Sequence, residues 1–322
     1  MIKQIINRTK KRISEHPMFI RLLMLLKTYK PYGFKGNSLY DVGSFFITAM
    51  RNEDIHLRAS SLAYSFFLSI FPLLLFLLTL IAYLPGESLK NQIIMDMELV
   101  LPQSSFSAIS STVTDILKNQ RSGLLSLGLL AAVYFSSNGM LTLINSLNRS
   151  VANKYPRTLL QKRLLAIGLT FFVILLLIIT GAALLFFDFT ETNLMKNTFI
   201  PDLLIQIIFF IAEVLVLMSA LFVIISSIYF YAPASKKTFR FISPGSILAT
   251  ILIILTTLIL QYYINNIHAY NKIYGSIGAV IALLIVLYFN SNCILIGFEL
   301  NRSIDKAKNE KLESRPFILK KL

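Results

Sequence analysis

The stretch Ile55–Pro85, IHLRASSLAYSFFLSIFPLLLFLLTLIAYLP, decides the fold of this chain. From Ala59 to Leu84 it contains no charged residue, and these 26 residues would form a helix about 39 Å long. A helix of that length crosses a hydrocarbon core of about 30 Å with some tilt. The stretch therefore predicts a membrane-spanning helix, with Arg58 at its entrance and Pro72 near its middle.

The rest of the chain repeats this pattern, and it predicts six spans in all. They lie at about residues 57–84, 123–147, 163–187, 203–230, 244–265 and 273–300. Only 15% of the 322 residues are charged, against roughly 25% in ordinary soluble domains. The sequence thus predicts an all-α polytopic membrane protein, a bundle of six transmembrane helices over residues 57–300. Residues 1–16 are basic and precede any long apolar run, so we expect no cleavable signal peptide.

The segments outside the spans are also patterned. Residues 1–56 predict a cytoplasmic or interfacial segment with amphipathic helices at Met18–Tyr29 and Leu39–Met50. The second helix fits either docking on the protein or, as we favour, lying in the membrane interface. Residues 88–118 hold apolar positions at helical spacing on both sides of Pro102, which predicts an external cap of two helices. Residues 301–322 predict a basic cytoplasmic tail.

The distribution of Lys and Arg predicts the orientation of the bundle. Of the 31 basic residues, 26 fall in the compartment that holds both termini and 5 fall in the other. Cytoplasmic segments carry this excess, so both termini are expected in the cytoplasm. The same bias accounts for the net charge of +15 without nucleic acid. We expect the bilayer itself as partner, with anionic lipids at the cytoplasmic face; the sequence leaves the oligomeric state open, a homo-oligomer included.

Glu213 is the clearest functional candidate, because ionisable groups at membrane depth are rare. It lies about ten residues into the fourth span, near the midplane. Its carboxyl group is expected to point into the bundle, toward Tyr134, Asn138, Thr256 or Thr257. Two interpretations stay open: a neutral Glu hydrogen-bonded to a neighbouring helix, and a carboxyl group that handles protons or cations.

Other polar and small residues inside the spans predict a polar seam or cavity, since amides in hydrocarbon must find partners. For each single residue, hydrogen bonding between helices is the simpler interpretation. The seam candidates are Tyr134, Asn138 and Asn145 in the second span and Asn290 and Asn292 in the sixth. Pro72 predicts a kink in the first span. Gly275 and Gly278 predict close approach of another helix to the sixth.

Arg58 and Glu299 are predicted to form an ion pair. Both should lie at the cytoplasmic face, where the first span begins and the sixth ends. Arg58 is at a helix N-terminus and Glu299 at a C-terminus, so each charge is disfavoured by its own helix dipole. The pair would join the two spans and would be a candidate gate. The alternative is that both side chains extend separately to the headgroups.

Constellations typical of soluble enzymes are missing from the sequence. The histidines His16, His56 and His268 are far apart, and no His/Cys cluster has metal-ligand spacing. No glycine-rich phosphate loop occurs, and the single cysteine, Cys293, cannot form an intrachain disulfide. We therefore expect no catalytic residue, no metal and no cofactor.

Four segments, in order, resemble a known family. They are RASSLAYSFFLSIFPLLL from Arg58; SLNRSV, with Asn148 and Arg149, followed by KRLLAIGL; YFYAP through SPG, with Pro233, Pro244 and Gly245; and YGSIGAVIALLIVLYFNSNCILIGFELN, with Gly275, Gly278, Gly297, Glu299 and Asn301. Over residues 40–303 the chain resembles the YihY/BrkB family of bacterial inner-membrane proteins, formerly labelled ribonuclease BN. It departs from the family in lacking tryptophans and in having Phe298 after Gly297. The resemblance implies a six-span protein of the bacterial plasma membrane that is transporter-like.

Three functions follow as hypotheses. The first is a transporter or flippase-like protein for an ion or an amphipathic envelope component. The second is a non-transporting envelope scaffold, in which the polar groups only join helices. A membrane-bound ribonuclease is a disfavoured third, because a nuclease needs clustered carboxylates or histidines that hold metals about 4 Å apart.

Overall fold

The computed structural model describes residues 17–52, 54–83, 87–100, 103–151, 157–197, 201–234, 240–266 and 277–319. Within these ranges all regular structure is α-helical and no strand occurs, which confirms the all-α prediction. Six of the described helices, α4, α7, α8, α9, α10 and α12, are long and apolar enough to cross a membrane. The elements are α2 Pro17–Thr28, α3 Leu39–Asn52, α4 Ile55–Tyr83, α5 Glu87–Val100, α6 Gln103–Lys118, α7 Ser122–Arg149, α8 Leu159–Asn197, α9 Asp202–Tyr231, α10 Pro244–Asn266 and α12 Ile277–Leu319.

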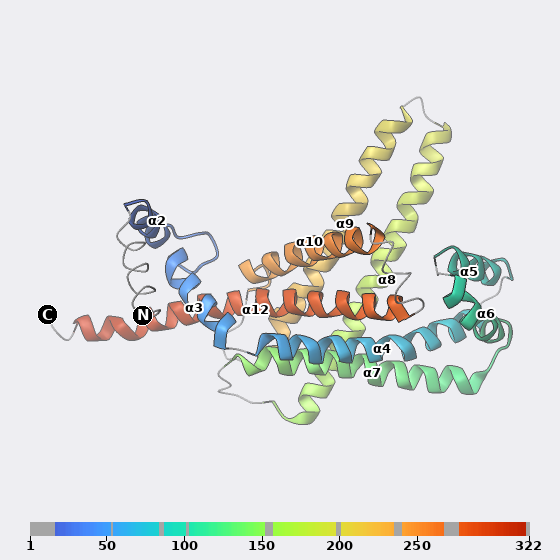
Figure 1. Ribbon diagram of the computed structural model, residues 1–322, viewed down its shortest axis with the longest axis horizontal. Helices are drawn as coiled ribbons and strands as arrows, with labels where there is room; N and C mark the ends of the chain where they lie inside the picture. The colour runs from blue at the N-terminus through green and yellow to red at the C-terminus, as the bar shows by residue number, and fades with distance from the viewer. Residues whose placement is uncertain are drawn as a thin grey trace, which may run out of the picture.

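The six long helices pack as neighbours in chain order. Each of α4, α7, α8, α9 and α10 contacts the next, and α12 contacts both α10 and α4. The last helix therefore closes the arrangement against the first. Figure 1 shows α4, α7, α10 and α12 running in one general direction, while the α8–α9 hairpin crosses them at a steep angle.

The two ends of the bundle differ. At one end, here called the tail end, α2, α3 and the last part of α12 project beyond the bundle (Figure 1). At the other, the cap end, lie α5 and α6, which are the two helices expected after the first span. The apolar face of α6 packs inward, since Val113 and Leu117 are buried and α6 contacts α4. Pro102, the expected break between the cap helices, lies outside the described residues.

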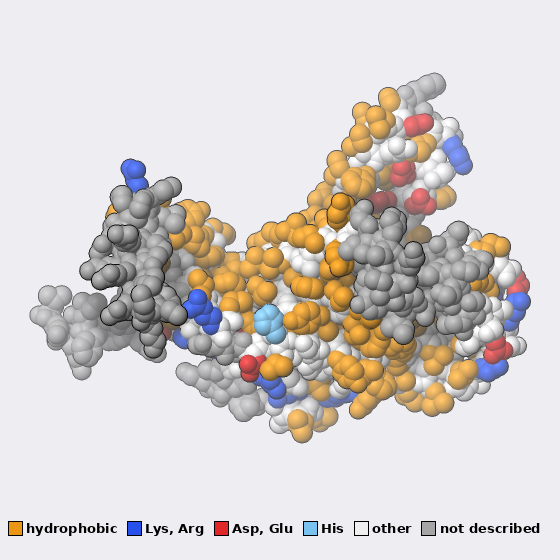
Figure 2. Space-filling view, viewed as in Figure 1, with side chains coloured by type: hydrophobic (Ala, Val, Ile, Leu, Met, Phe, Trp, Pro, Cys, Tyr) orange, Lys and Arg blue, Asp and Glu red, His pale blue; other side chains and the backbone are white. Residues whose placement is uncertain are grey.

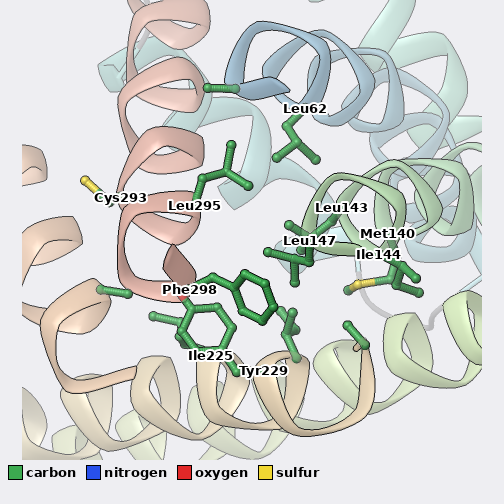
Figure 3. Close-up of a cluster of buried hydrophobic side chains, with 14 of the residues drawn as sticks. Leu62, Met140, Leu143, Ile144, Leu147, Ile225, Tyr229, Cys293, Leu295 and Phe298 are labelled. Carbon is green, nitrogen blue, oxygen red and sulfur yellow. The ribbon is translucent and has the colours of Figure 1, made fainter. Parts of the chain in front are cut away.

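The hydrophobic core lies toward the tail end. Figure 3 shows Phe298 of α12 beside Tyr229 and Ile225 of α9, with Leu143 and Leu147 of α7 facing them. The rings of Tyr229 and Phe298 meet edge to face at 5.5 Å. Away from this core the helices expose apolar side chains that a bilayer would cover. Figure 2 shows hydrophobic side chains spread over much of the described surface on the side that faces the viewer.

Two helices are longer than the predicted spans. α8 ends at Asn197 instead of near residue 187, and α12 continues to Leu319 instead of ending near residue 300. The apolar runs end near the predicted boundaries in both helices. Beyond Leu300 the residues of α12 are rich in good helix formers such as Lys, Glu and Arg, whereas those that extend α8 include Asp, Thr and Asn, so helix propensity accounts for the extension of α12 only. The predicted tail from residue 301 begins as packed helix.

The helix α3 docks on the protein rather than only on the membrane. Val42 is fully buried against Ile304 and Ala307 of α12, and the ammonium group of Lys306 lies 5.1 Å from the centre of the Phe45 ring. Of the two interpretations of the Leu39–Met50 stretch, docking on the protein agrees with the buried face of α3. Other residues of α3, such as Ile47, stay exposed.

The closest helix crossing is at Gly245 of α10 and Gly297 of α12. A Cβ atom on either glycine would come closer than 3.0 Å to the carbonyl oxygen of the other. The sequence instead points to Gly275 and Gly278 for close packing; Gly278 is buried, and Gly275 lies outside the described residues. Pro72 lies inside α4, which continues through it to Tyr83.

Candidate functional site

Arg58 and Glu299 form a buried ion pair at the tail end. The Nη2 atom of Arg58 lies 3.0 Å from Oε1 of Glu299, and their side chains are 2% and 1% exposed. They come from the first turn of α4 and from α12, so the structure contains the predicted pair between the first and last spans. Removing two charges from water is costly, and only further hydrogen bonds make such a pair tolerable.

Three more residues supply those hydrogen bonds. Nη1 of Arg58 donates to the carbonyl oxygen of Ser146 at 2.9 Å and to Oγ of Ser150 at 2.7 Å. The hydroxyl of Ser150 donates in turn to Oε1 of Glu299, and Arg302 donates to Oε2 at 3.2 Å. We call this set of five residues the charge network. It joins α4, α7 and α12 at one point.

Asn148 and Arg157 hold the end of α9 beside this network. The Asn148 amide donates to the carbonyl of Ala232 at 3.0 Å and accepts from the N–H of Ala234 at 2.7 Å. Arg157 donates to three successive carbonyls, those of Tyr231, Ala232 and Pro233. A cation is favoured at a helix C-terminus, where carbonyl groups lack partners. Partial burial lowers the pKa of Arg157 below its ordinary value, because desolvation disfavours the charged guanidinium.

Asn301 links α12 to the start of α10. Its Oδ1 accepts from the N–H of Gly245 at 2.8 Å, and its amide donates to Oγ of Ser243 at 2.8 Å. Ser243 also accepts from the N–H of Ser246, in the manner of a helix N-cap. The four segments that carry the family resemblance thus meet at the tail end. The first contributes Arg58, the second Asn148 and Ser150, the third Ala232 and Gly245, and the fourth Glu299 and Asn301.

The predicted polar seam is only partly assembled. On α7, Tyr134 is 58% exposed and its ring faces the Arg163 guanidinium at 4.7 Å, while Asn145 is exposed and Asn138 half-buried. The links from α7 to α4 are made by hydroxyl groups instead: Ser65 donates to Thr142 at 3.2 Å. A small, mainly apolar cavity of about 180 Å³ lies between α4, α7 and α8.

In the α12 half of the seam Asn292 is buried and Asn290 half-buried, and among the described residues neither joins the α7 half by a hydrogen bond. The Asn292 amide donates to the carbonyl of Tyr288 in its own helix at 2.9 Å. The Oδ1 atom of Asn290 and the Oγ atoms of Ser291 and Ser226 are buried without a hydrogen-bond partner in the described part of the chain. Buried polar atoms of this kind call for an explanation, which we take up below.

Glu213 makes no hydrogen bond or ion pair with its expected neighbours among the described residues. It is half-buried on α9, which packs against α8 and α10. Among the described residues no hydrogen bond or ion pair joins it to Tyr134, Asn138, Thr256 or Thr257; Thr256 contacts the thiol of Cys293 at 3.4 Å, and Thr257 is exposed. Of the four expected neighbours, Thr256 and Thr257 are on α10, which packs against α9, and Tyr134 and Asn138 are on α7.

Sequence reasoning missed most of the charge network around the predicted pair. Ser146, Ser150 and Arg302 were not candidates, and Arg157 was only one of several loop cations. The available signal was position: Ser150 ends the second span at the same face where Arg58 begins the first. A serine at that position is short enough for its hydroxyl group to bond to both Arg58 and Glu299 without pushing the two side chains apart.

The fold and this buried network define a multi-pass membrane protein with six spanning helices. The chain belongs to the BrkB family: the family described as virulence factor BrkB matches residues 46–317, which confirms the resemblance. It is also 33% identical over 256 residues to "Putative ribonuclease-like protein YfkH" of Bacillus subtilis (strain 168), a match that covers 78% of this chain and 90% of that protein. No solved structure gives a significant match.

Proposed function

We propose that the protein is a transporter or flippase-like protein of the bacterial plasma membrane, for an ion or an amphipathic envelope component. The observation that carries the proposal is the contrast between the two ends of the bundle. At the tail end of α9, residues 225–229 are all buried, whereas at its cap end only Ile205 is buried among residues 203–208. Figure 1 shows the α8–α9 hairpin diverging from the other spans toward its tip.

This shape is what an alternating-access protein has when one of its two ends is closed. The core around Tyr229 and Phe298, together with the charge network, closes the tail end. A diverging hairpin leaves a lateral approach from the lipid on the cap side. An amphipathic molecule needs such an approach, because its chains stay in the bilayer while its headgroup moves.

The orientation of the protein is part of the proposal. Both termini would lie in the cytoplasm, with the basic tail end against anionic lipids and the cap helices outside. Glu213 would then lie about 16 Å from the outer end of α9, on the diverging hairpin. The buried polar atoms of Ser226, Asn290 and Ser291 are the inner positions that a moving ion or its water would meet.

The test is reconstitution of the purified protein into liposomes, with assays of proton, sodium and fluorescent-lipid flux. Glu213→Gln keeps the shape of the side chain and removes its charge, so we expect loss of pH-dependent flux with the fold intact. Asp188→Asn, an exposed carboxyl on α8, is the matched control and should leave flux unchanged. Absence of flux for all three probes would favour the scaffold.

A non-transporting envelope scaffold is the alternative. It is favoured by one observation: most hydroxyls in the spans donate to a carbonyl of their own helix, as Thr142 and Thr250 do. Such groups need nothing else to be satisfied. In this alternative Glu213→Gln would be silent in every assay.

We also propose that the protein is not an enzyme and binds no nucleic acid. The name of the Bacillus subtilis relative describes that protein as ribonuclease-like. In this chain the described residues include no group of three or more His, Cys, Asp or Glu that could hold a metal. Incubation of the pure protein with labelled RNA, with and without Mg²⁺, tests the point directly; cleavage would contradict it.

A further inference from the structure

A groove of about 480 Å³ opens at the tail end, next to the charge network but separate from it. Four segments form it: the loop between α2 and α3, the residues just before α10, the first turn of α10, and α12 beyond Leu300. Two cations, Lys35 and Arg240, line the groove together with one carboxylate, Asp305. The lining therefore carries a net charge of +1, which complements a singly charged anion.

The two cations differ in how they are held. Lys35 is paired with Asp305, but an ammonium group has three N–H donors and keeps two of them. Arg240 is exposed, and among the described residues it makes no hydrogen bond or ion pair. Its guanidinium is thus free to bind a planar or tetrahedral anion through two N–H groups.

The N-terminus of α10 lies in the groove but offers few donors of its own. The N–H of Gly245 is taken by Asn301, and the N–H of Ser246 by Ser243. The helix dipole still adds partial positive charge at this point. Hydrogen bonds to an anion would come from Arg240 and Lys35, not from the backbone.

The loop that carries Lys35 has an unusual backbone. Gly33 has φ of +93°, and a Cβ atom there would lie 2.8 Å from Cγ of Pro244, so only glycine lets the loop meet α10 this closely. Lys35 itself has φ of +53°, in the left-handed region that side chains rarely adopt. Such a conformation is retained only where the surroundings fix it. Here it brings Lys35 to Asp305 in the wall of the groove.

An apolar stripe leads from the groove along α10. Ile247 lines the groove, and Ile251, Leu255 and Leu258 follow it at helical spacing, all between 45% and 57% exposed. From Ile247 to Leu258 the stripe rises about 16 Å, which is about half of the 30 Å hydrocarbon core. The stripe is thus as long as one leaflet is thick.

From this arrangement we propose that the groove binds the headgroup of an anionic glycerophospholipid of the tail-end leaflet. The phosphate contacts Arg240 and Lys35, and one acyl chain lies along the stripe from Ile247 to Leu258. A free phosphate ion would satisfy the two cations equally well; what favours a lipid is that the groove opens onto this lipid-facing stripe, so that headgroup and chain can be bound together. This binding site does not depend on the transport proposal.

The absence of tryptophan from the chain gives a direct test. A single reporter, Ile242→Trp, is placed in the groove lining, and its fluorescence is quenched by brominated phosphatidylglycerol or brominated phosphatidylcholine in vesicles of otherwise equal composition. The matched reporter is Leu164→Trp, an exposed position on α8 next to Lys162 and Arg163. Quenching of this second reporter measures the general attraction of nearby basic residues for anionic lipid at a position outside the groove.

We expect phosphatidylglycerol to be preferred over phosphatidylcholine more strongly at Ile242→Trp than at Leu164→Trp. Arg240→Gln should reduce that excess at least about tenfold, because it removes the charge-assisted hydrogen bonds that the guanidinium donates. Since Arg240 is exposed, this variant should fold normally, which size-exclusion chromatography checks. Equal preference at both reporters, or a preference that survives both Arg240→Gln and Lys35→Gln, would overturn the proposal.

A competition arm separates the lipid from a soluble anion. Inorganic phosphate is added in excess, with sodium chloride of equal ionic strength as the control for screening. A lipid held by both headgroup and chain should remain, so quenching should be the same in the two salts. Selective loss of quenching with phosphate would assign the groove to a small soluble anion instead.

Discussion

Nη2 of Arg58 and Oε1 of Glu299 lie 3.0 Å apart, although the two residues are 241 positions apart in the chain. The contact joins the beginning of the first spanning helix to the last one. Ser150 from α7 bonds to both partners. The carboxylate of Glu299 therefore connects α12 to the start of α4 and to the C-terminal end of α7.

Arg58→Ala should be strongly destabilising, by about 3–5 kcal/mol, because it leaves the Glu299 carboxylate buried without its main counter-charge. Arg121→Ala is the matched control: it removes an arginine from a pair with Asp115 that is about half exposed, and should cost about 0–1 kcal/mol. Unfolding in detergent with a chemical denaturant measures both. Similar losses for the two variants would contradict a buried pair.

A double-mutant cycle isolates the pair itself. Arg58→Ala combined with Glu299→Ala should be less destabilising than the sum of the single changes, because neither charge is then left alone. Additive effects would show that the two side chains act separately.

Asn148→Ala should cost about 1–3 kcal/mol, since it leaves the buried carbonyl of Ala232 and the N–H of Ala234 without the amide that binds them. Asn145→Ala, three residues earlier on the same helix and exposed, should change stability by less than about 0.5 kcal/mol. The same unfolding assay compares them. A larger effect at Asn145 would mean that the polar seam, not the tail-end contacts, holds α7.

Gly297→Ala should destabilise the protein by about 1–3 kcal/mol, because its Cβ would overlap the backbone of α10 at Gly245. Gly181→Ala should have the opposite sign and stabilise by up to about 1 kcal/mol, since nothing lies within 4 Å of the new methyl group on α8. Thermal unfolding in the same detergent distinguishes the signs.

Single cysteines test the proposed orientation, in a chain where Cys293 is replaced by Ser. Lys308→Cys, exposed on α12 at the tail end, should be protected from a membrane-impermeant thiol reagent in intact cells. Lys118→Cys, exposed at the end of α6 in the cap, should react readily. The reverse pattern would place the termini outside.

The spans and the Arg58–Glu299 pair could be predicted from the sequence because both follow from quantities that are counted along the chain. Hydropathy counted along the chain located α4 and α7, and equal depth at the same face brought Arg58 to Glu299. Depth alone could not choose among the neighbours predicted for Glu213, because α9 packs against α8 and α10, which carries Thr256 and Thr257, whereas Tyr134 and Asn138 are on α7. Neighbour relations are set by packing between helices.

The close crossing shows a second limit of sequence patterns. The small-residue spacing of Gly275 and Gly278 stays a prediction, because Gly275 lies outside the described residues, but a pattern within one helix did not point to the close contact between Gly245 and Gly297, which are on two helices. A spacing rule within one helix cannot find a pair that is completed by another helix.

The unbroken length of α12 has a mechanical consequence. The helix has 43 residues, and Gly297 stands near its midpoint, about 30 Å from one end and about 33 Å from the other. There the backbones of α10 and α12 meet at Gly245 and Gly297, and the Glu299 ion pair and the Asn301 hydrogen bonds hold α12 within the next four residues. A rigid rod that tilts about its middle moves its two ends in opposite directions. Because α12 is held near its middle, a tilt about this point would move its cap-end half and the segment beneath α3 in opposite directions.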